Sequence, residues 1–143
     1  MKILIPVYIL IVIFLVIFAS VFKKNTTEIK KVFLDVQKNK VNDIFITSMF
    51  RPDPNHNTGK ALDFNSKSGA SVLSAYEYIC NKYNDVRLGI GILNADRHIH
   101  IDLLGKNKNC KKRFIETSKI SSYCVDNLTC SQIIENIKSY YNY

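Results

Sequence analysis

The most continuous pattern in the chain is an apolar run from Ile3 to Phe22, which contains no charged residue. In a helix, about 20 apolar residues at ~1.5 Å each match the ~30 Å hydrocarbon layer of a bilayer. The run therefore predicts a transmembrane helix or a signal peptide. A signal peptide ends in a small-x-small cleavage site, and the bulky Ile17 and Phe18 stand where this run needs small residues. We therefore favour an uncleaved anchor over residues 1–23.

Beyond the anchor, apolar residues recur with helical and strand periods. Four of them recur at i, i+3, i+4 and i+7 and predict a helix over about residues 27–38: Ile29, Val32, Phe33 and Val36. Short apolar runs bounded by turn residues predict strands at 43–48, 61–65, 86–93 and 98–104. Helical spacing returns at residues 69–83, with Ser68 as the cap, and in a closing helix marked by Ile133, Ile134, Ile137 and Tyr141. Thr129 and Gln132 have the spacing of a capping box for that last helix.

These elements predict an α+β fold, in which helices pack on a small, mostly antiparallel sheet. Roughly 120 residues remain after the anchor, which is enough for one hydrophobic core. We therefore expect residues 24–143 to form a single domain. Residues 94–97 have the right length to join the strands at 86–93 and 98–104 as a hairpin.

The formal net charge of +8 raises the question of a nucleic-acid partner. One group of basic residues is dense: Lys106, Lys108, Lys111, Lys112 and Arg113. No aromatic residues interleave with this group, as a stacking platform for nucleic acid requires. We interpret the group as a solvated loop and expect no nucleic-acid partner; an anionic surface such as phospholipid or a cell-wall polymer is the alternative.

Two signals disagree about the side of the membrane on which the domain lies. The lysines that follow the anchor outnumber the one before it, so the positive-inside rule places the domain in the cytoplasm. The even set of cysteines instead suits two disulfides in an oxidising compartment: Cys80, Cys110, Cys124 and Cys130. N-glycosylation sequons at 25–27 and 127–129 also favour the outside. We expect an extracytoplasmic domain on a single-pass anchor, with at least one bridge among the last three cysteines.

Polar side chains share one face of the strand at 98–104. Residues two apart in a strand point to the same side, so His98, His100 and Asp102 lie on one face. The intervening apolar residues then face the core: Ile99, Ile101 and Leu103. The polar face is either a solvated sheet surface or part of a site.

A second motif upstream favours a site. His56 and Asp63 are seven residues apart, across a turn that contains Gly59. All three histidines of the chain therefore fall in two motifs. Zinc binds histidine nitrogen and aspartate oxygen tetrahedrally, and a catalytic zinc keeps three protein ligands with its fourth position open. Two ligands from this loop and strand, and a third from the strand at 98–104, would form such a site.

The two motifs resemble those of the zinc D-alanyl-D-alanine peptidases, which include bacterial carboxypeptidases, vancomycin-resistance dipeptidases and phage endolysins. The Hedgehog signalling domain shares the family's fold. The family pattern is Ser-x-His-x-x-Gly-x-Ala-x-Asp, followed later by a histidine before the end of a strand. Residues 54–63 read PNHNTGKALD and residues 98–102 read HIHID, so every element except the leading serine is present. The resemblance implies that His56, Asp63 and His100 are zinc ligands.

The resemblance also implies roles for residues around the metal. Arg51, in the segment TSMFRP, corresponds to the arginine that pairs with the substrate carboxylate, to which its planar fork can make two hydrogen bonds. His98 is expected next to the metal-bound water. The family places an acid or a histidine just ahead of the last ligand, so either His98 or Asp96 is expected to move the proton.

Three classes of function fit these residues. The first is a membrane-anchored zinc peptidase that cleaves D-Ala-containing peptides of peptidoglycan. The second is a binding or structural protein with the same fold and no catalysis, such as an envelope entry factor of a large DNA virus. The third is a lysine-rich anchored domain that binds anionic lipid or nucleic acid without a metal. The fold does not decide between the first two, because function depends on the site.

Overall fold

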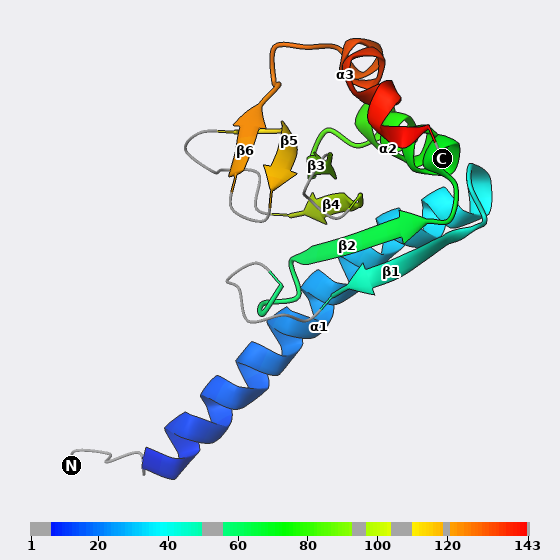
Figure 1. Cartoon of the computed structure of the whole chain (residues 1–143). Coiled ribbons are helices and arrows are strands. Elements are labelled where there is room, and N and C mark those ends of the chain that lie inside the picture. Colours follow the sequence, from blue (N-terminus) through cyan, green and yellow to red (C-terminus); the bar gives the residue numbers. More distant parts are fainter. Residues whose placement is uncertain (1–6, 50–55, 93–96, 104–109, 119–120, 143) are drawn as a thin grey trace, which may run out of the picture.

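The chain has an α+β architecture, as its sequence predicts (Figure 1). The computed structural model describes residues 7–49, 56–92, 97–103, 110–118 and 121–142. The described helices are α1 (Val7–Asn39), α2 (Gly69–Lys82), α3 (Cys130–Ile137) and the 3-10 helix η1 (Lys138–Tyr141). The described strands are β1 (Ile44–Ser48), β2 (Ala61–Ser66), β3 (Arg87–Gly91), β4 (Ile99–Asp102), β5 (Arg113–Ser118) and β6 (Ser121–Cys124).

The strands form one sheet in the order β1-β2-β4-β3-β5-β6. All neighbouring pairs are antiparallel except β3 and β5, which run parallel. The expected hairpin partners, β3 and β4, do pair antiparallel. The sequence did not lead us to predict β5 and β6, which extend the sheet on the far side of β3.

The apolar N-terminal run and the helix expected at 27–38 form one continuous helix, α1, of 33 residues. The segment contains neither glycine nor proline, so nothing in it interrupts the backbone hydrogen bonds. The large apolar side chains from Val7 to Val21 are exposed, and this half of α1 projects away from the rest of the molecule (Figure 1). α1 is long and apolar enough to cross a membrane, and a signal sequence can have the same length and composition.

The second half of α1 packs on the domain along the stripe that its sequence predicts. Its buried residues are Ile29, Val32, Phe33 and Val36. The ring of Phe33 meets that of Phe64 from β2 edge-on, with centroids 5.5 Å apart. Such a pair adds ~0.5–1.5 kcal/mol to the stabilisation from burial alone. Phe33 therefore fixes α1 against the sheet.

Alternation along the strands gives the sheet two different faces. The core face carries buried apolar residues from five strands: Ile44, Leu62, Phe64, Leu88, Ile90, Ile99, Ile101 and Ile115. Helices α1, α2 and α3 supply much of the rest of the same core, through residues such as Val72, Tyr76, Ile79 and Ile133. The other face carries the residues between them, and it is there that the polar groups of β2 and β4 lie.

Both predicted helix caps are present. The Ser68 side chain accepts a hydrogen bond from the backbone N–H of Ser71 at the start of α2. Thr129 and Gln132 form the reciprocal capping box of α3. Each cap satisfies backbone donors that the helix itself leaves without acceptors.

All four cysteines form disulfides, Cys80–Cys130 and Cys110–Cys124. The second bridge confirms the expectation of a bond among the last three cysteines. An N-terminal apolar helix together with two disulfides indicates a secretory or extracytoplasmic route.

The basic group at 106–113 is only partly the solvated loop that we expected. Lys111 and Lys112 are exposed, whereas Lys106 and Lys108 lie outside the described residues. Arg113 is the first residue of β5 and is half-buried, and its Nη1 donates to the carbonyl of Leu128 at 3.2 Å. Arg113 therefore belongs to the sheet, because the strand that contains it pairs with both β3 and β6.

Candidate metal centre

Three separate segments bring His56, Asp63 and His100 together. His56 opens a turn that ends at Gly59, whose backbone N–H donates to the His56 carbonyl at 3.0 Å. Gly59 has a φ of 69°, a conformation that glycine adopts without steric strain. Asp63 lies on β2 directly opposite His100 on β4 in the antiparallel register. Strand pairing thus places Asp63 next to His100, and the turn brings His56 to these two residues.

The metal-ligating atoms of these residues lie within 4.8 Å of one another. The Asp63 carboxylate is central: its Oδ1 is 2.6 Å from Nδ1 of His100 and 3.5 Å from Nε2 of His56. The rings of the two histidines meet edge-on, with centroids 5.3 Å apart. The three residues are 0%, 2% and 4% exposed in chain order. Two imidazoles and a carboxylate at this spacing could hold a metal ion, and such a donor set suits zinc among other divalent metals.

His100 lies between two carboxylates. Its Nδ1 faces Asp63, and its Nε2 is 3.0 Å from Oδ2 of Asp102. Burial alone would lower the pKa of His100, but the hydrogen bonds to Asp102 and Asp63 outweigh it and raise that pKa to about 9. Burial likewise opposes the charge on Asp63, yet its hydrogen bonds with His100 and His56 hold its pKa well below the usual range. Without a metal, His100 is therefore a protonated imidazolium that pairs with the ionised carboxylate of Asp63.

Asp102 is itself fixed by Arg87. The two residues are opposite each other on β4 and β3, and Nε of Arg87 donates to Oδ2 of Asp102 at 2.8 Å. The Asp102 side chain is completely buried. Burial raises its pKa, but His100 and Arg87 hold that pKa below the ordinary value. The arrangement is a carboxylate behind a histidine, which in metal sites fixes the ring and its tautomer.

Phe114 of β5 closes the site beside His100. The ring centroids of the two residues are 5.8 Å apart, and the Arg87 guanidinium lies 4.6 Å above the Phe114 ring. Gly89 lies between them in the sheet, opposite both His100 and Phe114. A Cβ at Gly89 would collide with the Phe114 ring, so glycine is what allows the aromatic ring to reach this position.

A carboxylate that the sequence did not reveal lies near His98. Nε2 of His98 is 3.2 Å from Oε2 of Glu116 on β5, and these side chains are 12% and 22% exposed. Burial raises the pKa of Glu116, but the hydrogen bond to His98 and the positive charges of His98 and His100 lower it below the ordinary value. Glu116 comes close because β5 runs parallel to β3 and Glu116 follows Phe114 by two residues, so that both side chains lie on the same face of the sheet. The alternation in RFIETS is the signal that could have indicated it.

The other sequence-predicted site residues have different outcomes. His98 pairs with Glu116, whose carboxylate also feels the charges of His100 and Asp63. Arg51 and Asp96 lie outside the described residues, so their roles stay predictions. Asp102, which we placed only on the polar face, holds His100 in position.

Comparison with protein-family models, with curated proteins and with solved structures gives no match to this chain. The likeness to zinc peptidases therefore stays a hypothesis, carried by the two motifs and by the way their residues converge.

Proposed function

We propose that this chain is a membrane-anchored zinc domain of the peptidase type, which hydrolyses D-Ala-containing or related peptide bonds of peptidoglycan outside the cytoplasm. One observation carries the proposal: His56, Asp63 and His100 converge within 4.8 Å at a buried position. These are the three residues that the motif resemblance selects as ligands. The two disulfides support the extracytoplasmic placement.

Each residue around the centre has a part in this proposal. When bound, zinc supplies Lewis-acid polarisation of a carbonyl and a lowered pKa for water. Asp102 and Arg87 hold the His100 ring, so that Nδ1 points toward Asp63. The His98 and Glu116 pair, which is the more exposed part of the site, accepts and returns the proton. Arg51 pairs with the terminal carboxylate of the substrate, as the resemblance implies.

The first test counts metal in the full chain purified in detergent. Wild-type protein should contain one zinc per chain, and His56→Ala, Asp63→Ala and His100→Ala should each lose it. His98→Ala is the matched control, because it removes the remaining histidine and should keep the metal. Absence of zinc from wild-type protein supplied with excess zinc would disprove the proposal.

The second test separates catalysis from metal binding. Glu116→Gln and His98→Ala should keep full zinc and slow the hydrolysis of a peptidoglycan stem peptide by ~10²-fold or more, the usual contribution of a proton acceptor. Hydrolysis is measured on the same zinc-loaded samples. If zinc-loaded wild-type protein does not cleave stem peptides or crosslinked muropeptides, the enzymatic part of the proposal is wrong.

One observation favours a second candidate, a non-catalytic domain in which the metal has a structural role. The three ligating residues are nearly inaccessible, with 0–4% exposure, whereas a catalytic zinc needs an open coordination position. In that case the metal joins the turn at 56–59 to β2 and β4, and its binding contributes directly to the stability of the fold. An anchored binding protein of a viral envelope belongs to this class. Removal of zinc would then lower the melting temperature of the domain, with no activity to lose.

A further inference from the structure

The contact between α1 and the rest of the fold begins where the exposed apolar segment of α1 ends. The large apolar side chains of α1 are exposed up to Val21. From Phe22 onward, one stripe of the helix is partly or fully covered: Phe22, Asn25, Thr26 and Ile29. These positions follow the i, i+3, i+4 and i+7 spacing of one helix face. The edge of the domain therefore lies level with the last turn of the apolar segment.

The segment that covers the first part of this stripe, from Phe22 to Thr26, is the turn that carries His56. A Cβ placed on Gly59 would lie 2.5 Å from Oγ1 of Thr26 and 3.2 Å from the Phe22 ring, so the Gly59 backbone rests directly on the helix. Nδ2 of Asn25 donates to the carbonyl of Thr58 at 3.4 Å. The turn is in this way held by α1 on one side and supplies a ligand to the candidate metal centre on the other.

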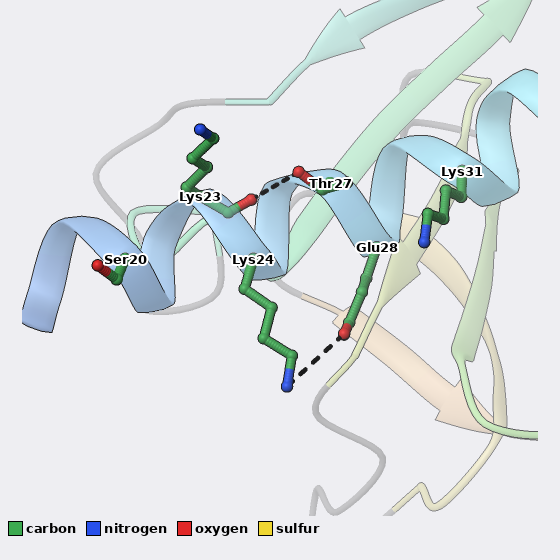
Figure 2. Close-up of a pocket in the computed structure, with 6 residues that line it drawn as sticks. All are labelled: Ser20, Lys23, Lys24, Thr27, Glu28 and Lys31. Atoms are coloured by element: carbon green, nitrogen blue, oxygen red, sulfur yellow. Dashed lines mark hydrogen bonds and ion pairs between the residues drawn. The ribbon is translucent and has the colours of Figure 1, made fainter.

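The exposed side of the same helix turns is polar and mostly basic. A shallow pocket of ≈ 380 Å³ is lined there by Ser20, Lys23, Lys24, Thr27, Glu28 and Lys31 (Figure 2). The only acid among these residues, Glu28, is 4.0 Å from Lys24. Lysines directly after a membrane segment lie at the level of the lipid headgroups and attract anionic ones. The change from apolar to basic side chains places the bilayer surface between Val21 and Lys23.

From these observations we propose that the turn at 56–59 lies in the headgroup layer of the bilayer, so that the candidate metal centre faces the membrane surface. Phe22 and Thr26 lie against the turn, with Phe22 at the boundary itself and Thr26 four residues, ~6 Å along the helix, beyond it. The inference rests on the anchor in the proposed function and does not depend on the metal.

A single tryptophan can report the depth of the turn, because the chain contains none. Asn57→Trp places the reporter at an exposed position of the turn, and Lys38→Trp places a control at an exposed position of the same helix. Lys38 is 16 residues beyond Phe22, which is about 24 Å along α1. Each full-length variant is reconstituted in nanodiscs of phosphatidylcholine and phosphatidylglycerol that contain either headgroup-labelled or acyl-chain-labelled quenching lipid.

The headgroup quencher should reduce the fluorescence of Asn57→Trp at least twofold more than that of Lys38→Trp, and more than the acyl-chain quencher does. Equal quenching of both variants, or stronger quenching of Asn57→Trp by the acyl-chain label, would overturn the inference. Protein that does not incorporate into nanodiscs would overturn it as well, together with the anchor. Because the measurement uses no metal, a chain without zinc would refute the proposed function and leave this result standing.

Discussion

At the scale of single residues, the candidate centre depends on how His100 is held. The ring has a carboxylate at each nitrogen, Asp63 at Nδ1 and Asp102 at Nε2. Asp102 cannot turn away, because Arg87 donates to the same carboxylate oxygen. A metal at this position requires Nδ1 without its proton, and the Nε2–H bond to Asp102 leaves Nδ1 as the coordinating atom.

Replacement of Asp102 tests this arrangement. Asp102→Asn keeps the shape of the side chain and removes the charge that orients the His100 ring. Zinc affinity should fall by about 10- to 100-fold, as is usual when the partner behind a metal-binding histidine is changed. The measurement is a competition titration with a chromophoric chelator. Asp85→Asn, at an exposed position near the start of β3, is the control and should leave the affinity unchanged. Equal affinities for both variants would contradict this role of Asp102.

The sequence predicted some site residues and missed others for a physical reason. His56 and Asp63 lie in one local motif, and period-two alternation places His100 and Asp102 on one face, so short-range pattern was sufficient for them. Glu116 reaches the site only through the parallel pairing of β3 and β5, which joins segments distant in sequence. The alternation in RFIETS can indicate the strand itself, but no local signal in a single sequence shows which strand it pairs with.

At the scale of elements, a polar cluster joins α1 to the end of α2. The Asp35 carboxylate accepts from Lys82 Nζ at 2.8 Å and 3.0 Å and from the Tyr83 hydroxyl at 2.7 Å. The hydrogen bond from Lys82, followed by that from Tyr83, lowers the pKa of Asp35 to about 2. The same contact with Asp35 raises the pKa of Lys82 above its usual value.

These shifts predict how the stability of the domain depends on pH. The pKa of Asp35 is lowered on folding, so its contribution is complete above the unfolded value of ~3.9 and is lost as the pH falls toward 2. The pKa of Lys82 is raised, so its contribution is complete below the unfolded value of ~10.4 and is lost at higher pH. Asp35→Asn should lower the melting temperature by a few degrees at pH 7, and the difference from wild type should shrink toward pH 2. A difference that stays constant from pH 7 to pH 2 would contradict the assignment.

Most elements were predictable because apolar residues recur with a helical or strand period over a segment long enough to be recognised. The helical stripe of α1, the cap of α2 and the capping box of α3 all agree with the structure. Strand β6 has four residues, none of them fully buried, so its sequence contains no apolar alternation. Strand β5 begins inside the basic group, at the half-buried Arg113, and this hides its start. Sheet pairing, and not local preference, determines both strands.

At the scale of the whole molecule, the two disulfides close loops of very different length. Cys80–Cys130 joins α2 to α3 across 50 residues, whereas Cys110–Cys124 joins the segment just before β5 to the end of β6 across 14. The longer bridge holds the C-terminal segment on the core, where the Tyr141 hydroxyl donates to the carbonyl of Gly91. Chain-entropy estimates give stabilisation of about 4 kcal/mol for the longer loop and about 3 kcal/mol for the shorter one.

Paired replacements should reveal this difference. C80A/C130A should lower the melting temperature of the full chain in detergent by more than C110A/C124A, because it releases the longer loop and frees α3 from α2. Near-ultraviolet circular dichroism follows the loss of tertiary packing, and alkylation before and after reduction confirms which bridges are present. Each pair is the control for the other, since both replace two disulfide-bonded cysteines by alanine. If C110A/C124A lowers the melting temperature as much or more, loop length does not govern the stability of this domain. The fold would then depend most on the edge of the sheet that β5 and β6 form.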